Sequence, residues 1–248
     1  MKRLLIFSVI FAFFINQFAV SALSTSAKAA ILINGDTLEV IYQENADKRL
    51  PMASTTKIMT ALLLCELGGD LSRTIVTTPE MVTVEGSSMG LLAGDTVSLR
   101  DLLYGMMLPS GNDAANTTAI VIGGSVDAFV GLMNNKAAQM GLHDTHFCTP
   151  SGLDAEGHYT TAYELALIAR EALKNETFAE AAASKTATLN YGNPPYRRTL
   201  TNHNKLLRMY DDVVGVKTGF TKKSGRCLVS AARKDGKYVI AVTLNDGN

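Results

Sequence analysis

The chain has 248 residues, of which 47% are apolar and 19% are charged, with 23 basic side chains against 23 acidic ones. This composition excludes collagen-like, intrinsically disordered and polybasic proteins. Without its first 29 residues the chain has 219 residues and a net charge of −3. A slightly acidic domain lacks the electrostatic footprint that phosphate backbones require, so we expect no nucleic-acid partner.

Residues 1–29 are typical of an export signal. Lys2-Arg3 precedes an apolar run at 4–20, and Ala27-Lys28-Ala29 has the small residues of a cleavage site before Ala30. A second candidate cleavage site follows Val20-Ser21-Ala22. The alternative is an uncleaved membrane anchor, in which Asn16 and Gln17 would lie in lipid at a desolvation cost. In either case we expect the folded part outside the cytoplasm.

The first folded elements are predicted to be a hairpin and a central helix. The β-rich runs Ile31 to Ile33 and Leu38 to Tyr42 are separated by Asn34-Gly35-Asp36, whose Asn-Gly pair readily adopts the positive φ of a tight turn. Thr55 to Leu67 lacks Gly and Pro, is almost wholly apolar beyond Lys57, and stops at Gly68-Gly69. This pattern predicts a helix that is buried on most sides.

Three helices in a row, from about residue 98 to 141, predict a helical lobe. Ser98-Leu99-Arg100-Asp101 resembles a capped helix start, Pro109-Ser110-Gly111 breaks the first helix, and Ser125 begins the third. Thr161-Ala162-Tyr163-Glu164 has capping-box spacing and predicts a fourth helix toward Leu173.

The last third of the chain is rich in strands. Val213 to Lys217, Leu228 to Arg233 and Tyr238 to Leu244 read as strands, and Asp235-Gly236 joins the last two. Strands at both ends around a block of helices predict a mixed α+β fold, in which helices pack on an antiparallel sheet and a helical lobe is inserted at about 80–150.

The cysteines and histidines predict no metal site. Cys65, Cys148 and Cys227 cannot all pair with one another, and their spacing fits neither a zinc ligand set nor a disulfide scaffold. His143 and His146 lack partners at metal-ligand spacing. We therefore expect buried thiols, structural loop histidines and no cofactor.

Ser54-Thr55-Thr56-Lys57 is the first motif that carries chemistry. Residues three apart on a helix share a face, so the Ser54 hydroxyl would lie beside the Lys57 amine. A lysine can take a serine's proton only if its pKa falls from about 10.4 toward neutrality, and burial and a second cation both lower it. The helix N-terminus would favour an oxyanion at the serine. The alternative is an N-cap serine beside an exposed lysine.

Two further motifs follow in order. Ser110-Gly111-Asn112 occupies the break between two predicted helices, where its side chains are free to point into a cleft. Lys217-Thr218-Gly219 ends a predicted strand, whose edge can offer backbone groups to an extended peptide. The alternatives are a capping turn for the first motif and a solvated strand end for the second. The three motifs in this order are hard to assign to chance.

Ser-x-x-Lys, Ser-x-Asn and Lys-Thr-Gly form the motif set of penicillin-binding proteins and class A β-lactamases. Together with Gly86-Ser87-Ser88-Met89, Leu108 to Ala114, Asn134, Thr145-His146-Phe147, Gly152-Leu153-Asp154 and Val216, they resemble the D-alanyl-D-alanine carboxypeptidases of the low-molecular-mass penicillin-binding proteins. The resemblance covers nearly all of residues 31–246. It implies a β-lactamase/transpeptidase-like fold for residues 30–248.

The resemblance also implies a role for each motif residue. Ser54 would be the acylated nucleophile, Lys57 its base, Ser110 a proton relay to the leaving D-alanine, and Asn112 a holder of the peptide and of the Lys57 amine. Lys217 and Thr218 would bind the terminal carboxylate of the substrate, and Gly219 would leave room for the backbone. The N–H groups of Ser54 and Phe220 would form the oxyanion hole.

The implied function is removal of the terminal D-alanine from peptidoglycan pentapeptide stems through an acyl-enzyme, with β-lactam antibiotics as inhibitors.

Two departures from the related pattern matter. Gly111 stands where β-lactamases have Asp, and no Glu is placed to activate a deacylating water, which argues against efficient β-lactam hydrolysis. The chain also stops at Asn248, whereas many relatives continue into a covering helix, a β-rich domain and a membrane-binding tail. We therefore expect a truncated C-terminal end and peripheral membrane association in a longer form.

Rival functions use the same site. A β-lactamase or esterase would turn the acyl-enzyme over quickly on β-lactams, and a non-catalytic β-lactam sensor would release no D-alanine.

Overall fold

The computed structural model describes residues 24–247. Its main sheet has five antiparallel strands in the order β2-β1-β9-β8-β7. Strands from the two ends of the chain meet where β1 pairs with β9. The strands are β1 (Ala27–Asn34), β2 (Val40–Glu44), β7 (Val213–Thr221), β8 (Gly225–Lys234) and β9 (Lys237–Asp246). The prediction of an antiparallel sheet built from both ends of the chain is confirmed.

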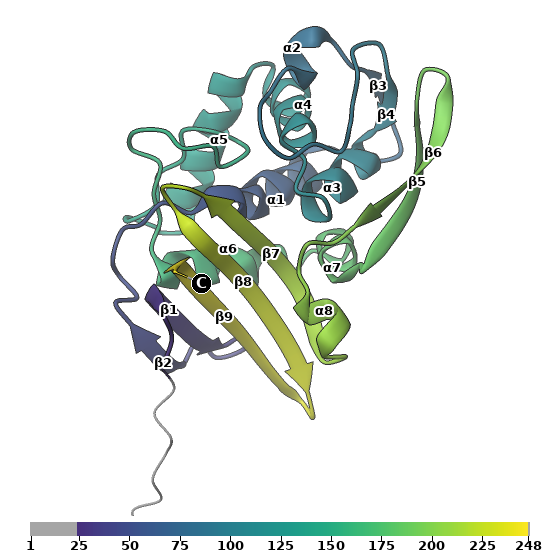
Figure 1. Cartoon of the computed structure of the whole chain (residues 1–248). Coiled ribbons are helices and arrows are strands. Elements are labelled where there is room, and N and C mark those ends of the chain that lie inside the picture. The colour runs from purple at the N-terminus through teal and green to yellow at the C-terminus, as the bar shows by residue number, and fades with distance from the viewer. Residues whose placement is uncertain (1–23, 248) are drawn as a thin grey trace, which may run out of the picture.

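Helices lie against this sheet and form a lobe beside it (Figure 1). The helix α6 (Ala162–Ala172) packs on β1 and β9, and α7 (Glu176–Ala183) packs on β7. The lobe contains α2 (Pro79–Val82), α3 (Leu99–Met107), α4 (Asn112–Gly123) and α5 (Val126–Gln139). As predicted, side-chain oxygens of Ser98, Ser125 and Thr161 cap α3, α5 and α6 by accepting a backbone N–H from three residues further on.

The central helix lies between the sheet and the lobe. α1 (Lys57–Leu67) contacts α3, α4 and α6, and Ile58, Met59 and Leu64 are fully buried. The predicted helix start at Thr55 is instead a 3-10 turn, η1 (Ala53–Thr56). The hydroxyls of Thr55 and Thr56 donate to the carbonyls three residues earlier, which stabilises this tighter turn.

A second sheet of four strands, which the sequence analysis missed, flanks the lobe in the order β3-β4-β5-β6. Two of its strands are only three residues long, too short for a periodic pattern. The β5–β6 hairpin rises beside the lobe in Figure 1. The strands are β3 (Thr74–Val76), β4 (Thr96–Ser98), β5 (Thr186–Gly192) and β6 (Pro195–Thr201).

The predicted Asn34-Gly35 turn is wrong in detail, although the two strands form. The positive φ of 67° lies at Leu38, and Asn34 Oδ1 instead accepts the N–H groups of Asp36 and Thr37. Gly35 is needed for close approach, because a Cβ there would lie 2.3 Å from the Tyr238 ring. The Asp235-Gly236 turn has the predicted positive φ at both residues.

The first strand begins three residues before the predicted domain boundary at residue 30, which itself stays a prediction. β1 starts at Ala27, which pairs with Asp246, and Ala29 is fully buried. Most of the predicted export signal lies outside the described residues, and its cleavage stays a prediction.

The three cysteines are free thiols; Cys227 is buried as expected, whereas Cys65 and Cys148 are only partly buried, so the expectation of buried thiols is wrong for these two. Within residues 24–247, no single helix is long and apolar enough to cross a membrane; α4 and α5 meet that criterion only as a pair bent by 85°.

Candidate active site

Ser54 and Lys57 lie one turn apart where the central helix begins. Ser54 belongs to η1 and Lys57 is the first residue of α1, and Lys57 Nζ lies 3.0 Å from Ser54 Oγ. Lys57 has an exposed fraction of 0%. This burial excludes the alternative of a capping serine beside a solvent-exposed lysine.

The hydrogen bonds of Lys57 orient it as a base. Nζ lies 2.7 Å from Asn112 Oδ1 and 2.7 Å from the carbonyl oxygen of Ser151. Asn112 Nδ2 donates to the carbonyl of Glu85, so the amide oxygen must face Lys57. Both oxygens can only accept. A neutral Lys57 amine therefore donates its two hydrogens to these oxygens, and its lone pair faces the Ser54 hydroxyl.

The surroundings of Lys57 favour its uncharged form. Burial lowers the pKa of Lys57 well below its ordinary value, the ammonium of Lys217 lowers it further, and the carboxylate of Asp113 opposes both. Lys217 is itself 1% exposed, and burial lowers its pKa to about 7. Because a desolvated amine beside a cation resists protonation, the site supplies the free base that an activated serine requires.

Ser110 lies in the link between α3 and α4, and Asn112 is the first residue of α4. Ser110 adopts a left-handed φ of 63°, and its hydroxyl is buried without a hydrogen-bond partner in the described part of the chain. Gly111 is the N-cap residue of α4, and no side chain caps that helix. The capping-turn alternative therefore fails. A buried hydroxyl without a partner costs about 1–3 kcal/mol, which a ligand bound in the cleft can recover.

The segment Lys217-Thr218-Gly219 of β7 faces the nucleophile turn. Lys217 is buried and its Nζ donates to the carbonyl of Thr218 at 3.0 Å, so the solvated strand end is excluded. Gly219 passes so close to η1 that a Cβ there would lie 3.0 Å from the backbone nitrogen of Ser54. Phe220 is 66% exposed at the mouth of the site.

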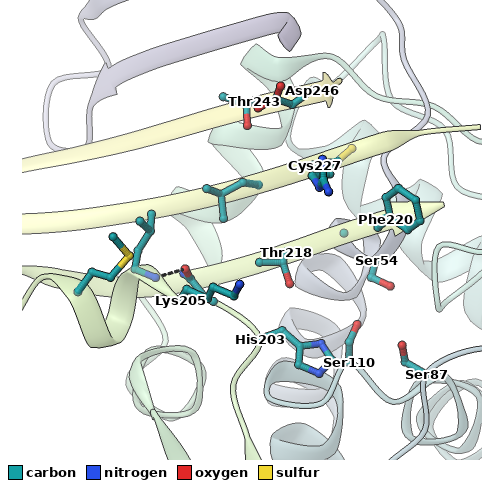
Figure 2. Close-up of a pocket in the computed structure, with 16 residues that line it drawn as sticks. Ser54, Ser87, Ser110, His203, Lys205, Thr218, Phe220, Cys227, Thr243 and Asp246 are labelled. Atoms are coloured by element: carbon teal, nitrogen blue, oxygen red, sulfur yellow. Dashed lines mark hydrogen bonds between the residues drawn. The ribbon is translucent and has the colours of Figure 1, made fainter. Parts of the chain in front are cut away.

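These groups surround one cleft of about 640 Å³. Figure 2 shows the hydroxyls of Ser54, Ser110 and Thr218 around a common space, with His203 beside them. Lys57, Asn112 and Lys217 lie buried behind the cleft surface. The lining residues are Ser54, Ser87, Ser110, His203, Asn204, Lys205, Leu206, Met209, Thr218, Gly219, Phe220, Arg226, Cys227, Leu228, Thr243 and Asp246. The structure thus brings all eight predicted site residues to one place.

Several groups at the site were missed by the sequence analysis. His203 precedes the short helix α8 (Leu206–Met209), and its pKa is lowered by burial and by the cations of Lys217 and Arg208. No motif marks His203. Ser151 contributes only a backbone carbonyl, which leaves no signature in the residue type.

Packing explains the glycine in the second motif. A Cβ at Gly111 would lie 2.6 Å from Asp113 Oδ1 and 2.9 Å from the backbone nitrogen of Met89. The Asp113 carboxylate also accepts the N–H groups of Met89, Gly90 and Leu91. The aspartate that β-lactamases carry at position 111 therefore has no room here.

A serine paired with a buried lysine, facing a cationic strand across one cleft, defines the protein class as a serine acyl-transfer enzyme of the transpeptidase and β-lactamase fold. Comparison with known proteins gives the family. The D-alanyl-D-alanine carboxypeptidase family of peptidases, S11, matches residues 16–248. The chain belongs to this family, as the motif resemblance predicted.

Individual relatives agree with this assignment. The chain is 38% identical over 226 residues to D-alanyl-D-alanine carboxypeptidase DacF of Bacillus subtilis, covering 90% of this chain and 58% of the relative. It is 38% identical over 242 residues to a D-alanyl-D-alanine carboxypeptidase of Streptomyces sp. strain K15, covering 91% of this chain and 83% of the relative. The chain thus spans little more than half the length of the Bacillus protein.

Solved structures confirm the predicted fold. The crystal structure of the Streptomyces K15 DD-transpeptidase is similar to this chain with a TM-score of 0.88 at 34% identity, covering 92% of this chain and 93% of that one.

Proposed function

We propose that this chain is a serine-type D-Ala-D-Ala carboxypeptidase that removes the terminal D-alanine from peptidoglycan pentapeptide stems. The observation that carries the proposal is the fully buried Lys57, whose Nζ lies 3.0 Å from Ser54 Oγ while the buried cation of Lys217 is near enough to lower the pKa of Lys57. Family membership and relatives named D-alanyl-D-alanine carboxypeptidase support it.

In the proposed reaction, Ser54 Oγ attacks the carbonyl carbon of the penultimate D-alanine while its proton passes to Lys57 Nζ. The N–H groups of Ser54 and Phe220 stabilise the oxyanion. The C–N bond then breaks, and Ser110 relays a proton to the nitrogen of the leaving D-alanine. Water hydrolyses the Ser54 ester and restores the free hydroxyl.

Recognition of the substrate uses the cationic side of the cleft. Lys217 and Thr218 bind the terminal carboxylate, Asn112 holds the peptide and the Lys57 amine, and Gly219 admits the substrate backbone. A charged carboxylate in a partly desolvated cleft needs such a cationic partner. The reaction needs no metal or cofactor. Because stem peptides lie outside the cytoplasm, we place the activity there, and a longer form would associate peripherally with the membrane.

A paired assay tests the proposal. The protein is incubated with a diacyl-D-Ala-D-Ala peptide while free D-alanine is measured, and separately with nitrocefin. A carboxypeptidase releases D-alanine and hydrolyses nitrocefin slowly, whereas a β-lactamase-like hydrolase turns nitrocefin over quickly. A β-lactam sensor releases no D-alanine. Mass spectrometry after penicillin treatment must then place the adduct on Ser54; an adduct elsewhere contradicts the proposal.

Transpeptidation is a second candidate outcome of the same acyl-enzyme. It is favoured by the likeness to a structure described as a DD-transpeptidase. The two reactions share every step up to the Ser54 ester and differ only in whether water or an amine attacks it. Adding a glycyl acceptor peptide to the D-alanine assay and measuring the ratio of hydrolysed to transferred product separates them.

A further inference from the structure

A buried chain of hydrogen bonds runs from the loop after α5 to the nucleophile turn. Thr56 and His158 are 0% and 6% exposed, and neither lines the cleft. Burial lowers the pKa of His158 to about 4, with smaller lowering contributions from the neighbouring His146 and Lys223 and an opposing one from Asp154. The ring is therefore neutral near physiological pH and carries a single N–H.

The direction of each hydrogen bond in this chain follows from the groups present. The backbone N–H of Cys148 donates to His158 Nδ1 at 2.9 Å, so Nδ1 carries no hydrogen. Nε2 must hold the proton and donate it to Thr56 Oγ1, 2.8 Å away. The Thr56 hydroxyl donates its own hydrogen to the carbonyl oxygen of Ala53, also at 2.8 Å.

The carbonyl at the end of the chain belongs to the peptide unit that contains the backbone nitrogen of Ser54. A trans peptide is planar, with its C=O and N–H pointing in opposite directions. Holding the Ala53 oxygen against Thr56 therefore aims the Ser54 N–H the other way, toward Gly219 on β7. That N–H is one of the two proposed oxyanion donors.

The turn needs such a constraint because its backbone is strained. Ala53 has a left-handed φ of 47°, a conformation that is unfavourable for a residue with a Cβ. Gly152 packs closely against the same carbonyl, since a Cβ there would lie 1.9 Å from the Ala53 oxygen and 2.9 Å from Thr56 Oγ1. The Thr56 hydroxyl and Gly152 therefore both restrict the position of this carbonyl in the strained turn.

We propose that His158 is a positioning residue, which acts through Thr56 to orient the Ala53–Ser54 peptide and so to aim the Ser54 N–H at the developing oxyanion. The inference rests on the proposed role of Ser54 as nucleophile. Neither His158 nor Thr56 touches the substrate. An oxyanion donor contributes about 10²–10³ to the rate, so its misorientation should slow acylation without weakening the initial complex.

The test compares isosteric variants of Thr56. Thr56→Val removes the hydroxyl but keeps the shape, and Thr56→Ser keeps the hydroxyl. With a fluorescent penicillin, we expect Thr56→Val to lower the acylation rate constant by about tenfold or more. This is less than the full rate loss caused by removing an oxyanion donor, because the N–H is misoriented and not lost. The dissociation constant of the non-covalent complex and the acidic limb of the pH profile should stay unchanged, because Lys57 is not altered. Thr56→Ser should acylate at nearly the wild-type rate.

A second pair keeps the inference falsifiable if Thr56→Val does not fold. His158→Gln retains an N–H donor that can reach Thr56, whereas His158→Leu does not. The acylation rate constant of His158→Gln should therefore be higher than that of His158→Leu. The inference is overturned if Thr56→Val acylates like the wild type, if Thr56→Ser is as slow as Thr56→Val, or if the two His158 variants acylate equally. Absence of a Ser54 adduct in the wild-type protein would instead overturn the proposed function.

Discussion

Lys57→Ala should abolish most acylation while leaving binding nearly intact. The change removes the atom 3.0 Å from Ser54 Oγ that accepts its proton. A positioned general base contributes about 10²–10⁴ in rate, equivalent to ~2.7–5.4 kcal/mol of transition-state stabilisation. Because Lys57 lies behind the cleft surface, the dissociation constant of the non-covalent β-lactam complex should change by less than about threefold, under ~0.7 kcal/mol.

Stopped-flow measurement with a fluorescent penicillin separates the two quantities, since the saturating rate reports acylation and the half-saturating concentration reports binding. The exposed Lys237→Ala is the matched control and should behave as wild type. Removing the amine also leaves Asn112 Oδ1 and the Ser151 carbonyl without a donor, at about 1–3 kcal/mol each, so thermal unfolding must show a folded variant. An unchanged acylation rate, or a loss confined to binding, would refute the assignment.

Three further outcomes are expected. Lys217→Met removes a cation that lowers the pKa of Lys57, so the acidic limb of the acylation profile should move to higher pH; a limb that stays in place contradicts the coupling. In the wild type, carboxylate recognition should weaken as pH rises through about 7, where free Lys217 loses its proton, and KM for the peptide measured across that range checks this. Gly111→Asp should lower the free energy of unfolding by about 1–3 kcal/mol through overpacking against Asp113 and Met89, and it should not raise nitrocefin turnover. Urea unfolding measures the first effect, and rapid nitrocefin hydrolysis by the variant would contradict the second.

The elements that carry the site could be predicted because their signals are local. Ser98, Ser125 and Thr161 cap helices through bonds to N–H groups three residues away, and the Asp235-Gly236 turn needs only its own positive φ. The strands β3 and β4 of the second sheet could not be predicted, because they are too short for a periodic pattern and take their strand geometry from pairing with each other.

The three motifs, through their resemblance to a known family, were enough to name the serine, lysine, asparagine and cationic strand of the site, but not His203 or the Ser151 carbonyl. The sequence could not tell a buried Lys57 from an exposed one. That distinction depends on acceptors 55 and 94 residues away, Asn112 and Ser151, and on the nearby Lys217.

What the sequence by itself determined is therefore the inventory: a serine, a lysine, a free hydroxyl and a cationic strand end, each on a locally encoded element. Only the tertiary structure decided how those groups behave. Desolvation of Lys57, the Ser110 hydroxyl that finds no partner among residues 24–247, and the direction of the His158 hydrogen bonds all arise where distant segments pack together. Burial and electrostatic fields depend on distance in space and not on separation along the chain.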